Sequence, residues 1–478
     1  MLNNVRALVL AAGRSTRFNT DRSKLLYTVC GLKMILYPLK VLESLNIPMT
    51  IIIGYQGDQI QKAIEDAKIN NVTFVTQQQA LGTGNAVAIS NGTWDKDNFL
   101  ILNGDLPLLN LEIIQNLINQ HQENKSTISF ISAHCLNPFG YGRVIREGKE
   151  VFIVEEKNCT QDQKFTTLIN AGIYLVSKKY LNENISKLKL NEISKEFYLT
   201  DLVNLATKQE LEVNTVLVPY DNVRGVNTLE ELWAAEQIKR SELMKYWMSK
   251  GVRFELAQSI HVDYDVEIGT GSFIGTGAHL LHGTKVGKNC VVNAFTIVDD
   301  SIIGDNSNIN SHTIVKNSKI GCNVQVGPFA RIHRNVVLDD NVNIGNFVEL
   351  KNSKIGKDSK AKHLTYIGDT RIGKKVNVGA GTITCNYDGT RKHRTIIENN
   401  AFIGSNNTLI APVKIGESSY TAGGSTINKD VPSNSLAIGR SKQQNKKNYF
   451  KKTKKNEKES SKLSFIGATK SNGSEHNL

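Results

Sequence analysis

Several features that would place a protein in a common class are missing from this sequence. No apolar run approaches the roughly 20 residues that a membrane-spanning helix needs. The N-terminus enters a strand-like segment at residues 5–10, without the charged and apolar regions of a secretory signal. The six cysteines lie far apart and form no CxxC pair, which is typical of a reducing cytosol rather than of a disulfide framework or zinc site. We therefore expect a soluble cytoplasmic protein.

Two common nucleotide-binding signatures are also absent. The sequence contains no GxxxxGK[ST], which excludes a P-loop, and no GxGxxG, which excludes the dinucleotide-binding fingerprint. Any nucleotide site in this chain must therefore be of another kind.

The positive charge of the chain is concentrated near its C-terminus. Residues 440–462 contain ten Lys or Arg and two Glu, and they supply +8 of the net charge of +13. Because residues 441–478 have a low apolar content, we expect a basic, disordered tail there. Tyr449 and Phe450 are the only aromatic residues among these cations, so a nucleic-acid role is not favoured, and a contribution to binding a phosphate-rich ligand fits better.

A six-residue period dominates the chain from residue 268 to residue 437. Aliphatic residues recur at Ile268, Ile274, Leu280 and Val286, and the series resumes over 320–350 and 397–415. Glycine often follows the aliphatic position. A period of six is neither helical nor a simple strand alternation, so it indicates a repeat architecture. It predicts a parallel β-helix, in which each short strand turns one aliphatic side chain inward and glycine permits the corner.

The first 227 residues show a different pattern, in which short apolar runs alternate with helix-like stretches. The predicted strands are 5–10, 50–53, 72–75, 99–102 and 127–131, and the predicted helices include 60–68 and 111–122. This alternation predicts a doubly wound, Rossmann-like α/β sheet with ligands at the carboxyl ends of its strands. Thr228 and Glu231 form a capping box, which predicts a helix to about Ser249. We expect domains at 1–227 and 251–440, joined by a helical linker at 228–250.

Four polar or glycine-rich loops follow strands of the α/β half. They are residues 10–18 with Lys24, Gln77 with 81–84, 103–107, and 225–227. Small residues in the first loop let the backbone approach a phosphate chain, whose charge Arg17 and Lys24 can neutralise. Asp105 in the third loop can hold Mg²⁺ on a nucleotide phosphate. Each loop alone could be an ordinary turn, but four together favour a binding site.

These loops resemble those of the sugar-phosphate nucleotidyltransferases. The first loop is similar to their LAAGxGTR…K signature, with Ser15 where glycine is usual. Further matches are NPFGYGR at 137–143, IVEEK at 153–157, NAG at 170–172 and YLTD at 198–201. Together with the repeat half, the chain up to about residue 440 is similar to the bifunctional bacterial N-acetylglucosamine-1-phosphate uridyltransferase/glucosamine-1-phosphate acetyltransferase family. The resemblance implies that the repeat half is a left-handed β-helix.

The resemblance implies that the α/β half transfers a uridylyl group from UTP to N-acetylglucosamine-1-phosphate, with release of pyrophosphate. The residues it assigns to the UTP and sugar-nucleotide site are Leu10, Ala11, Ala12, Gly13, Lys24, Gln77, Gly82, Thr83, Asn103, Gly104, Asp105, Gly140, Glu155, Asn170 and Asn227. Asp105 and Asn227 would hold Mg²⁺. The nucleophile is already an anionic phosphate, so no general base is needed. We expect Arg17 and Lys24 to act as electrostatic catalysts.

For the repeat half, the resemblance implies acetyl transfer from acetyl-CoA to glucosamine-1-phosphate, with His363 as general base. The residues it assigns to the glucosamine phosphate are Arg331, His333, Lys351, Tyr366, Asn377, Asn386 and Tyr387, and those near acetyl-CoA are Ala380, Ser405, Gly423 and Arg440. The six-residue period breaks between Thr384 and Ile396, which predicts a loop that leaves the β-helix. His333 stands where the family usually has a phosphate-binding arginine, and Arg331 or Arg334 could compensate. Gly423 replaces an alanine, a change we expect to be harmless.

The family also forms homotrimers, with acetyl-transfer sites between subunits. The implied order is acetylation first and uridylation second, and the UDP-N-acetylglucosamine formed feeds peptidoglycan and, where present, lipopolysaccharide synthesis. Two alternatives stay open at this point. The chain could be a single-function sugar nucleotidyltransferase with a structural β-helix, or a non-catalytic scaffold whose basic tail binds an acidic partner.

Overall fold

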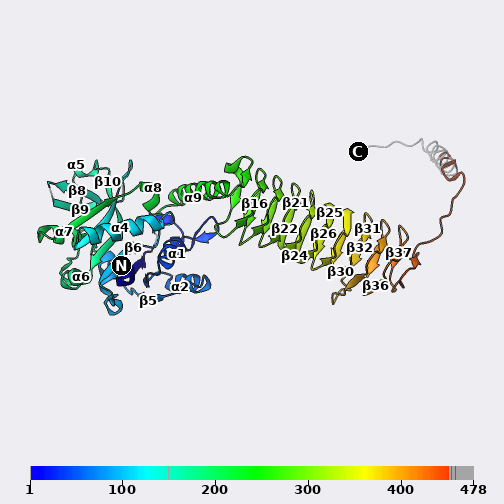
Figure 1. The fold of residues 1–478 in the computed structure, drawn as a ribbon, viewed down its shortest axis with the longest axis horizontal. Helices are drawn as coiled ribbons and strands as arrows, with labels where there is room; N and C mark the ends of the chain where they lie inside the picture. The colour runs from blue at the N-terminus through cyan, green and yellow to red at the C-terminus, as the bar shows by residue number, and fades with distance from the viewer. Residues whose placement is uncertain (1, 15, 149, 452–453, 455–457, 459–478) are drawn as a thin grey trace, which may run out of the picture.

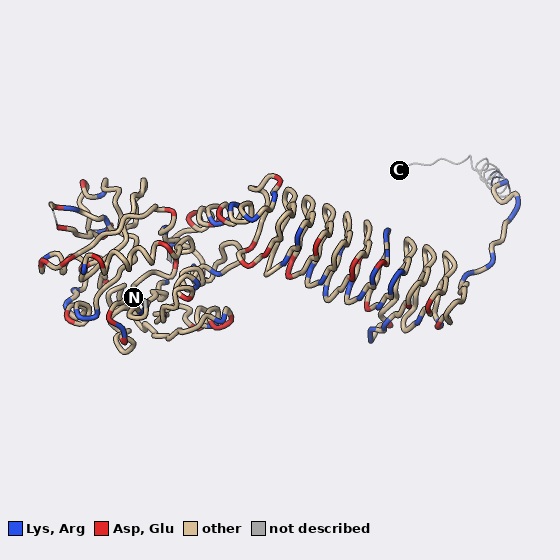
Figure 2. The backbone as a smooth tube through the Cα atoms, viewed as in Figure 1, with Lys and Arg blue, Asp and Glu red and all other residues tan. Residues whose placement is uncertain are grey.

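The computed structural model describes residues 2–14, 16–148, 150–451, 454 and 458. An α/β region contains the N-terminus, and a long rod of short strands extends from it (Figure 1). Within the described residues no helix is both long and apolar enough to cross a bilayer. Ser15 and most of the predicted basic tail, residues 452–453, 455–457 and 459–478, lie outside the described residues. Lys and Arg positions, coloured blue, recur along the described part of that tail beyond the last coil of the rod (Figure 2).

A nine-stranded mixed sheet forms the centre of the α/β region. Seven strands lie in the order β11-β7-β10-β6-β1-β4-β5, and β8 and β9 form a hairpin beside β10. The bounds of the strands are β1 (Val5–Ala11), β4 (Met49–Ile53), β5 (Val72–Thr76), β6 (Asn98–Asn103), β7 (Ile128–His134), β8 (Arg143–Glu147), β9 (Glu150–Val154), β10 (Leu168–Ser177) and β11 (Val213–Leu217). The five predicted strands correspond to β1 and β4–β7. Strand β10, which runs antiparallel between β6 and β7, was not predicted.

Helices cover both faces of this sheet, as the doubly wound prediction requires. Their bounds are α1 (Leu36–Ser44), α2 (Gly57–Asp66), α3 (Thr83–Ala88), α4 (Leu111–Glu123), α5 (Gln161–Lys164), α6 (Lys178–Asn184), α7 (Asp201–Lys208) and α8 (Tyr220–Val223). Alternation along β6 shows the two cores, because Leu100 and Leu102 belong to one buried cluster and Phe99 and Ile101 to the other.

The long helix α9 (Leu229–Ser249) connects the α/β region to the rod, as the capping box predicts. The Thr228 side chain accepts a hydrogen bond from the Glu231 N–H, and the Glu231 side chain accepts one from the Thr228 N–H. Each end of this exchange satisfies an amide that has no partner inside the helix.

The rod is the predicted β-helix, built from parallel strands on three faces. One face is a sheet of 11 strands: β12 (Arg253–Phe254), β15 (Phe273–Ile274), β18 (Val291–Val292), β21 (Asn308–Ile309), β23 (Gln325–Val326), β25 (Asn343–Asn346), β28 (Lys360–His363), β31 (Asn377–Val378), β34 (Phe402–Ile403), β37 (Tyr420–Thr421) and β39 (Leu436–Ala437).

The other two faces form one continuous sheet of 17 strands, because β22 and β24 bend around the corner between them. The second face holds β13 (His261–Val262), β16 (His279–Leu281), β19 (Ile297–Asp299), β22 (Ile314–Ile320), β24 (Arg331–Leu338), β26 (Glu349–Lys351), β29 (Tyr366–Gly368), β32 (Ile383–Cys385), β35 (Thr408–Ile410) and β38 (Thr426–Ile427). The third holds β14 (Glu267–Ile268), β17 (Lys285–Val286), β20 (Ile302–Ile303), β27 (Lys354–Ile355), β30 (Thr370–Ile372), β33 (Thr395–Ile397) and β36 (Val413–Ile415).

The six-residue period fills the interior of this β-helix. Ile268, Ile274, Leu280 and Val286 all belong to one buried cluster, which continues through the aliphatic residues of 320–350 and 397–415. The glycine corners are close-packed: a Cβ atom at Gly269 would lie 2.5 Å from the Gly287 carbonyl carbon of the next coil. Because each coil buries its apolar side chains only against its neighbours, stability is built up locally along the rod.

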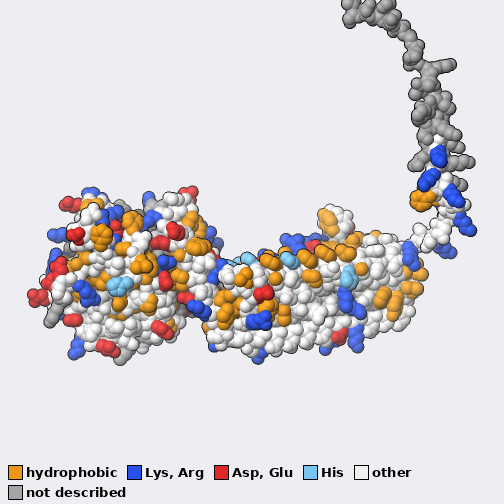
Figure 3. Space-filling view, turned by 90° about the horizontal axis from the view of Figure 1, so that it is seen from above, with side chains coloured by type: hydrophobic (Ala, Val, Ile, Leu, Met, Phe, Trp, Pro, Cys, Tyr) orange, Lys and Arg blue, Asp and Glu red, His pale blue; other side chains and the backbone are white. Residues whose placement is uncertain are grey.

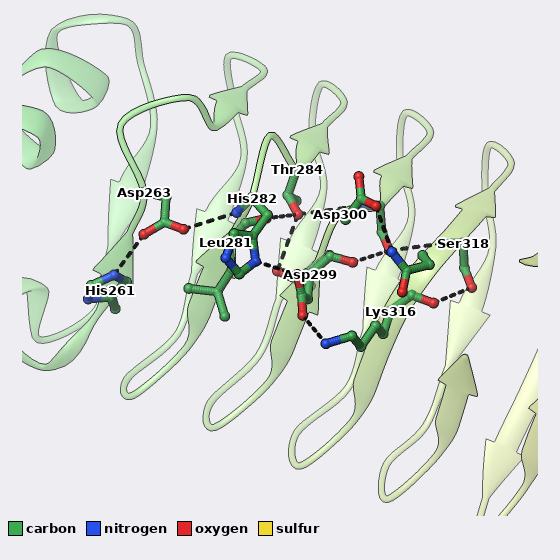
Figure 4. Close-up of polar contacts among 12 residues, drawn as sticks. His261, Asp263, Leu281, His282, Thr284, Asp299, Asp300, Lys316 and Ser318 are labelled. Atoms are coloured by element: carbon green, nitrogen blue, oxygen red, sulfur yellow. Dashed lines mark hydrogen bonds and ion pairs between the residues drawn. The ribbon is translucent and has the colours of Figure 1, made fainter. Parts of the chain in front are cut away.

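The first coils of the β-helix also contact the α/β region directly. The Tyr264 N–H donates to the Cys30 carbonyl at 2.8 Å. The buried carboxylate of Asp263 accepts from the His282 N–H at 3.0 Å and pairs with His261 at 2.9 Å. From there polar contacts pass along the rod through Asp299 to Lys316 (Figure 4).

Candidate functional sites

The carboxyl ends of β1 and β6 meet because these strands are parallel neighbours. Leu10 is the register partner of Asn103, so the small-residue loop after β1 lies beside the loop that carries Asp105. The Gly104 N–H donates to the Leu10 carbonyl at 3.0 Å. This topology explains how two segments about ninety residues apart form one site.

Two adjoining cavities, of about 280 and 520 Å³, occupy this edge of the sheet. They share Leu10, Arg17, Thr83, Asn103, Asp105 and Asn227, so they form one continuous cleft. The larger cavity adds the first loop, Lys24 and Gln77. The smaller adds Gly140, Glu155 and Asn170. Every predicted residue of the nucleotide site except Gly104 therefore lines this cleft.

Gly104 is placed beneath the cleft, where it has a packing role. A Cβ atom there would lie 2.5 Å from the Ile35 Cδ1 atom. A larger residue at this position would displace the end of the Ile35 side chain.

Lys24, Asp105 and Asn227 converge where the two cavities join. The Lys24 ammonium forms an ion pair with Asp105 Oδ2 and donates to Asn227 Oδ1 at 2.8 Å. Asp105 is 8% exposed. Its other oxygen, Oδ1, is buried and has no hydrogen-bond partner within the described residues. A compact group of one cation, one carboxylate and one amide thus faces the cleft.

Arg17 brings a second cation to the cleft. It lies on the short helix Thr16–Phe18 and lines both cavities. A Cβ atom at Gly140 would lie 3.3 Å from its Nη1 atom, so the guanidinium is next to the loop at 137–142. The cleft therefore holds two cations, Lys24 at Asp105 and Arg17 at the loop 137–142.

Thr200 and Tyr174 also line the smaller cavity, and the sequence analysis gave neither of them a role. The Thr200 hydroxyl donates to Glu155 Oε1 at 2.9 Å, and Asn170 Nδ2 donates to the Tyr174 hydroxyl at 2.6 Å. Burial raises the pKa of Glu155, and the Thr200 hydrogen bond only partly opposes this. Thr200 belongs to the YLTD motif, which was the available signal for it.

On the β-helix, most candidate sugar-phosphate residues lie on the second face. Arg331, Glu349 and Tyr366 are successive register partners, and so are His333, Lys351 and Gly368. A Cβ atom at Gly368 would lie 2.5 Å from the Tyr366 hydroxyl and 2.8 Å from Asn386 Nδ2, so these two side chains fill the space over that glycine. The structure therefore brings Arg331, His333, Lys351, Tyr366 and Asn386 together.

The surroundings of His333 distinguish between its two neighbouring arginines. His333 Nε2 lies 3.0 Å from Glu349 Oε1. Arg331 is two residues earlier on the same strand and therefore on the same side of the sheet. Arg334 has a φ of +56° at the corner and lines a different groove with Lys285 and Asp300. Only Arg331 is placed to assist His333.

Asn377 and Tyr387 are not part of that cluster within one chain. Asn377 begins β31 on the first face, where it pairs with Lys360. Tyr387 is 61% exposed on the predicted excursion from the β-helix, which runs from the end of β32 to the start of β33. An isolated bridge between Tyr387 and Lys392 and an ion pair between Asp388 and His393 hold this loop in shape.

His363 ends β28 at the corner between the first and second faces. Its Nδ1 atom lies 3.0 Å from the Asn346 Oδ1 atom of the preceding coil. An amide oxygen can only accept, so this contact requires the proton on Nδ1, and in the neutral ring Nε2 is then the acceptor. Tyr366 follows three residues later on the second face, which places the sugar-phosphate cluster just around the corner.

The candidate acetyl-CoA residues continue from His363 along the same corner. The Gly381 N–H approaches the His363 carbonyl at 3.4 Å, and the Asn406 N–H donates to the Ala380 carbonyl at 2.7 Å. Gly424 then donates to Ser405 at 2.8 Å, and Arg440 donates to the Gly423 carbonyl at 2.8 Å. Ala380, Ser405, Gly423 and Arg440 thus form a line along the rod.

In the opposite direction this corner carries a ladder of aromatic rings. Phe295, His312, Phe329 and Phe347 stack with centroids 5.0–5.5 Å apart, and Leu364 follows them. Phe295, Phe329 and Phe347 are each at least half exposed. Hydrophobic and histidine side chains are visible along an edge of the rod in the space-filling view (Figure 3). We call Phe295, His312, Phe329, Phe347 and Leu364 the aromatic edge.

Comparisons with known proteins agree with both halves. Residues 7–156 match the MobA-like NTP transferase domain, and residues 256–338 match the GMPPB C-terminal domain. The chain is 39% identical over 452 residues to the Bifunctional protein GlmU of Streptococcus mutans, covering 93% of this chain and 97% of that protein. It is 40% identical to the GlmU of Thermosipho africanus, covering 92% and 95%, and 36% identical to that of Alkaliphilus metalliredigens, covering 93% and 98%.

Proposed function

The chain belongs to the family of bifunctional GlmU proteins, which make UDP-N-acetylglucosamine in two steps, and we propose that these steps use two separate sites on it. Glucosamine-1-phosphate is first acetylated from acetyl-CoA on the β-helix. Uridylyl transfer from UTP to the acetylated sugar phosphate then takes place in the cleft of the α/β region. The two sets of residues are disjoint, which supports two sites.

Uridylyl transfer needs positioning and charge neutralisation rather than a protein nucleophile. A phosphate oxygen of N-acetylglucosamine-1-phosphate forms a bond to the α-phosphorus of UTP, and the bond from that phosphorus to the pyrophosphate oxygen breaks. No proton has to move, because the nucleophile is already an anion. Lys24 and Arg17, at the junction of the cavities, would stabilise the charge that spreads over the phosphates. The convergence of Lys24, Asp105 and Asn227 is the observation that carries this assignment.

Mg²⁺ fits the oxygen atoms of Asp105 and Asn227. They provide a carboxylate and an amide oxygen, which are hard donors, and the unpartnered Asp105 Oδ1 is suited to a cation. When bound, Mg²⁺ would neutralise charge on the UTP phosphates.

Acetyl transfer uses His363 as the general base. Because Asn346 accepts from Nδ1, the unprotonated Nε2 can take a proton from the sugar amine as its nitrogen attacks the thioester carbonyl. The carbon–sulfur bond then breaks, and CoA leaves as its thiol after taking up a proton. The line from Ala380 to Arg440 would hold CoA, and Arg331, His333, Lys351, Tyr366 and Asn386 would hold the sugar phosphate.

The acetyl-transfer site is completed by another copy of the chain. His363 and Lys351 flank one corner, whereas Asn377 lies on the first face and Tyr387 on the outward loop. Facing corners of two copies could bring these residues to one substrate. The exposed aromatic edge continues along this same corner and would be covered by such a contact. A closed homotrimer satisfies the contact on every copy.

One assay tests the whole assignment. The protein is given glucosamine-1-phosphate, acetyl-CoA, UTP and Mg²⁺, and both CoA thiol and pyrophosphate are measured. Release of both supports two activities. Pyrophosphate that appears only with pre-acetylated sugar would leave a nucleotidyltransferase with a structural β-helix, and no turnover would leave a scaffold. Sedimentation velocity at several concentrations tests the trimer, and a monomer at all of them contradicts it.

A further inference from the structure

Arg143 is the largest of the fully buried side chains in the described residues, and no role assigned above uses it. It begins β8, is 2% exposed, and does not line either cavity of the cleft. A guanidinium stays charged at any ordinary pH, so burying one is costly unless its partners compensate. The identity of those partners therefore indicates what the burial achieves.

Arg143 forms an ion pair with Glu156, and both side chains hydrogen-bond to the backbone of the loop at 137–142. Arg143 Nη2 lies 2.6 Å from Glu156 Oε2, and Nη1 donates to the Tyr141 carbonyl. The same Glu156 oxygen accepts from the Gly140 N–H at 3.1 Å. Burial alone would raise the pKa of Glu156, but Arg143 and the Gly140 N–H outweigh it, and its pKa lies below the ordinary value. Both ions of the pair thus hold backbone of the cavity wall.

The pair also connects the other walls of the smaller cavity. Glu156 directly follows Glu155, which lines the cavity. Arg143 is the register partner of Ile169, and the Asn170 N–H donates to the Gly142 carbonyl at 2.9 Å. Three predicted ligand contacts from three separate segments, Gly140, Glu155 and Asn170, therefore depend on one ion pair, of which Arg143 is buried and Glu156 half-buried.

We propose that Arg143 and Glu156 are a positioning pair that sets the sugar-phosphate end of the uridylyl-transfer cleft without touching the substrate. This rests on the assignment of uridylyl transfer to the cleft. Residues 11–13 and Lys24 line only the larger cavity, where the UTP phosphates would bind, so the smaller cavity, whose wall the pair holds, is left for the sugar phosphate. Loss of the pair should therefore raise KM for N-acetylglucosamine-1-phosphate about tenfold and leave KM for UTP within about twofold, because remote positioning acts on the contacts it holds.

The test uses the full-length chain with Glu156→Gln, Arg143→Lys, Arg143→Met and the double variant Arg143→Met/Glu156→Gln. Pyrophosphate release from UTP and N-acetylglucosamine-1-phosphate is measured with each substrate varied in turn. Arg146→Met, an exposed arginine on the same strand, is the matched control. Arg143→Lys keeps the charge and should recover part of the loss, and the double variant should cost no more than the worse single one.

Several outcomes decide the matter. An unchanged sugar-phosphate KM in Glu156→Gln overturns the proposal, and so does an equal rise in both KM values with a lowered Tm, which would mark the pair as merely structural. If Arg143→Met does not fold, Glu156→Gln and Arg143→Lys still give the answer. Acetyl transfer on the β-helix reports intact protein in each variant. A wild-type chain that releases no pyrophosphate would instead refute uridylyl transfer itself.

Discussion

The two halves of the molecule build their sites in opposite ways. In the α/β region, loops from strands distant in sequence enclose a cleft, and Lys24, Asp105 and Asn227 already touch within one chain. On the β-helix, the candidate residues lie on an exposed corner and its flanking faces, and His363 and Tyr387 are solvent-exposed. A sheet with crossovers encloses a cleft between its loops, whereas a corner of a β-helix projects outward. A projecting corner is enclosed only when another surface is placed against it.

Removal of the His363 side chain should give the largest difference between the activities of the two halves. We expect His363→Ala to lower CoA thiol release by about 10²- to 10⁴-fold, the usual contribution of a general base, with uridylyl transfer unchanged. Thiol release and pyrophosphate release are followed in the same preparation. Asn346→Ala should produce a smaller loss of acetyl transfer, because it removes the acceptor that keeps the proton on His363 Nδ1 but leaves the base in place. Equal thiol release from His363→Ala and wild type would contradict the assignment.

Lys24→Ala should affect only the cleft. We expect pyrophosphate release to fall by about 10²- to 10³-fold, because a cation aimed at the reacting phosphates is lost, while acetyl transfer stays intact. Lys62→Ala, an exposed lysine on α2, serves as the control. If Lys24→Ala also slowed thiol release, the two sites would be coupled, and the contrast between the halves would fail.

His333→Arg should strengthen the site on the β-helix. Arginine offers a planar fork to a phosphate and can still pair with Glu349, so we expect KM for glucosamine-1-phosphate to fall about fivefold, which corresponds to roughly 1 kcal/mol. Arg334→His, on a corner that faces another groove, should leave this KM unchanged. Steady-state thiol release at varied sugar phosphate decides between them. An unchanged KM in His333→Arg shows that Arg331 already suffices.

The smallest expected effect concerns the stability of the rod. The hydrogen bond to Asp299 raises the pKa of His282, so its contribution is full below about pH 6.5 and is lost as pH rises through the raised pKa. Burial would raise the pKa of Asp299, but Lys316 and His282 hold it below its ordinary value, so its contribution is lost only in acid. Asp263 and Asp265 also face His282 and favour its charged form.

We therefore expect His282→Asn to lower the free energy of unfolding by about 0.5 kcal/mol at pH 5.5 and by less at pH 8.5, since the His282 side chain is largely exposed and its interaction with Asp299 is screened by solvent. Urea denaturation at both pH values measures this. Lys316→Met removes the other partner of Asp299 and should show no such difference between the two pH values. An equal loss at both pH values in His282→Asn would refute the account.

The sequence predicted best what local physics determines. The six-residue period placed Ile268, Ile274 and their successors in the core because each coil buries its residues against its neighbours. The capping box placed the start of α9 because it also depends on neighbours in the sequence, Thr228 and Glu231. The loops after β1 and β6 were predicted to converge because carboxyl ends of parallel strands share an edge.

What the sequence did not reveal depends on long-range pairing. Strand β10 carries no signal that it runs antiparallel between β6 and β7. The family resemblance assigned Lys351 and Asn377 to the same sugar phosphate, whereas within one chain they lie on different faces. A period of six predicts which side chains point into the β-helix. It does not say which of the three faces a residue occupies.

The coil-to-coil register of the β-helix has one more consequence. Successive coils are about 4.8 Å apart, and each is joined only to the coil before and the coil after it. The number of coils therefore fixes the distance between two points on the rod in steps of one coil spacing. Insertion or removal of one whole coil between residues 281 and 316 would move the two candidate sites apart or together by one coil spacing, without altering any residue in either.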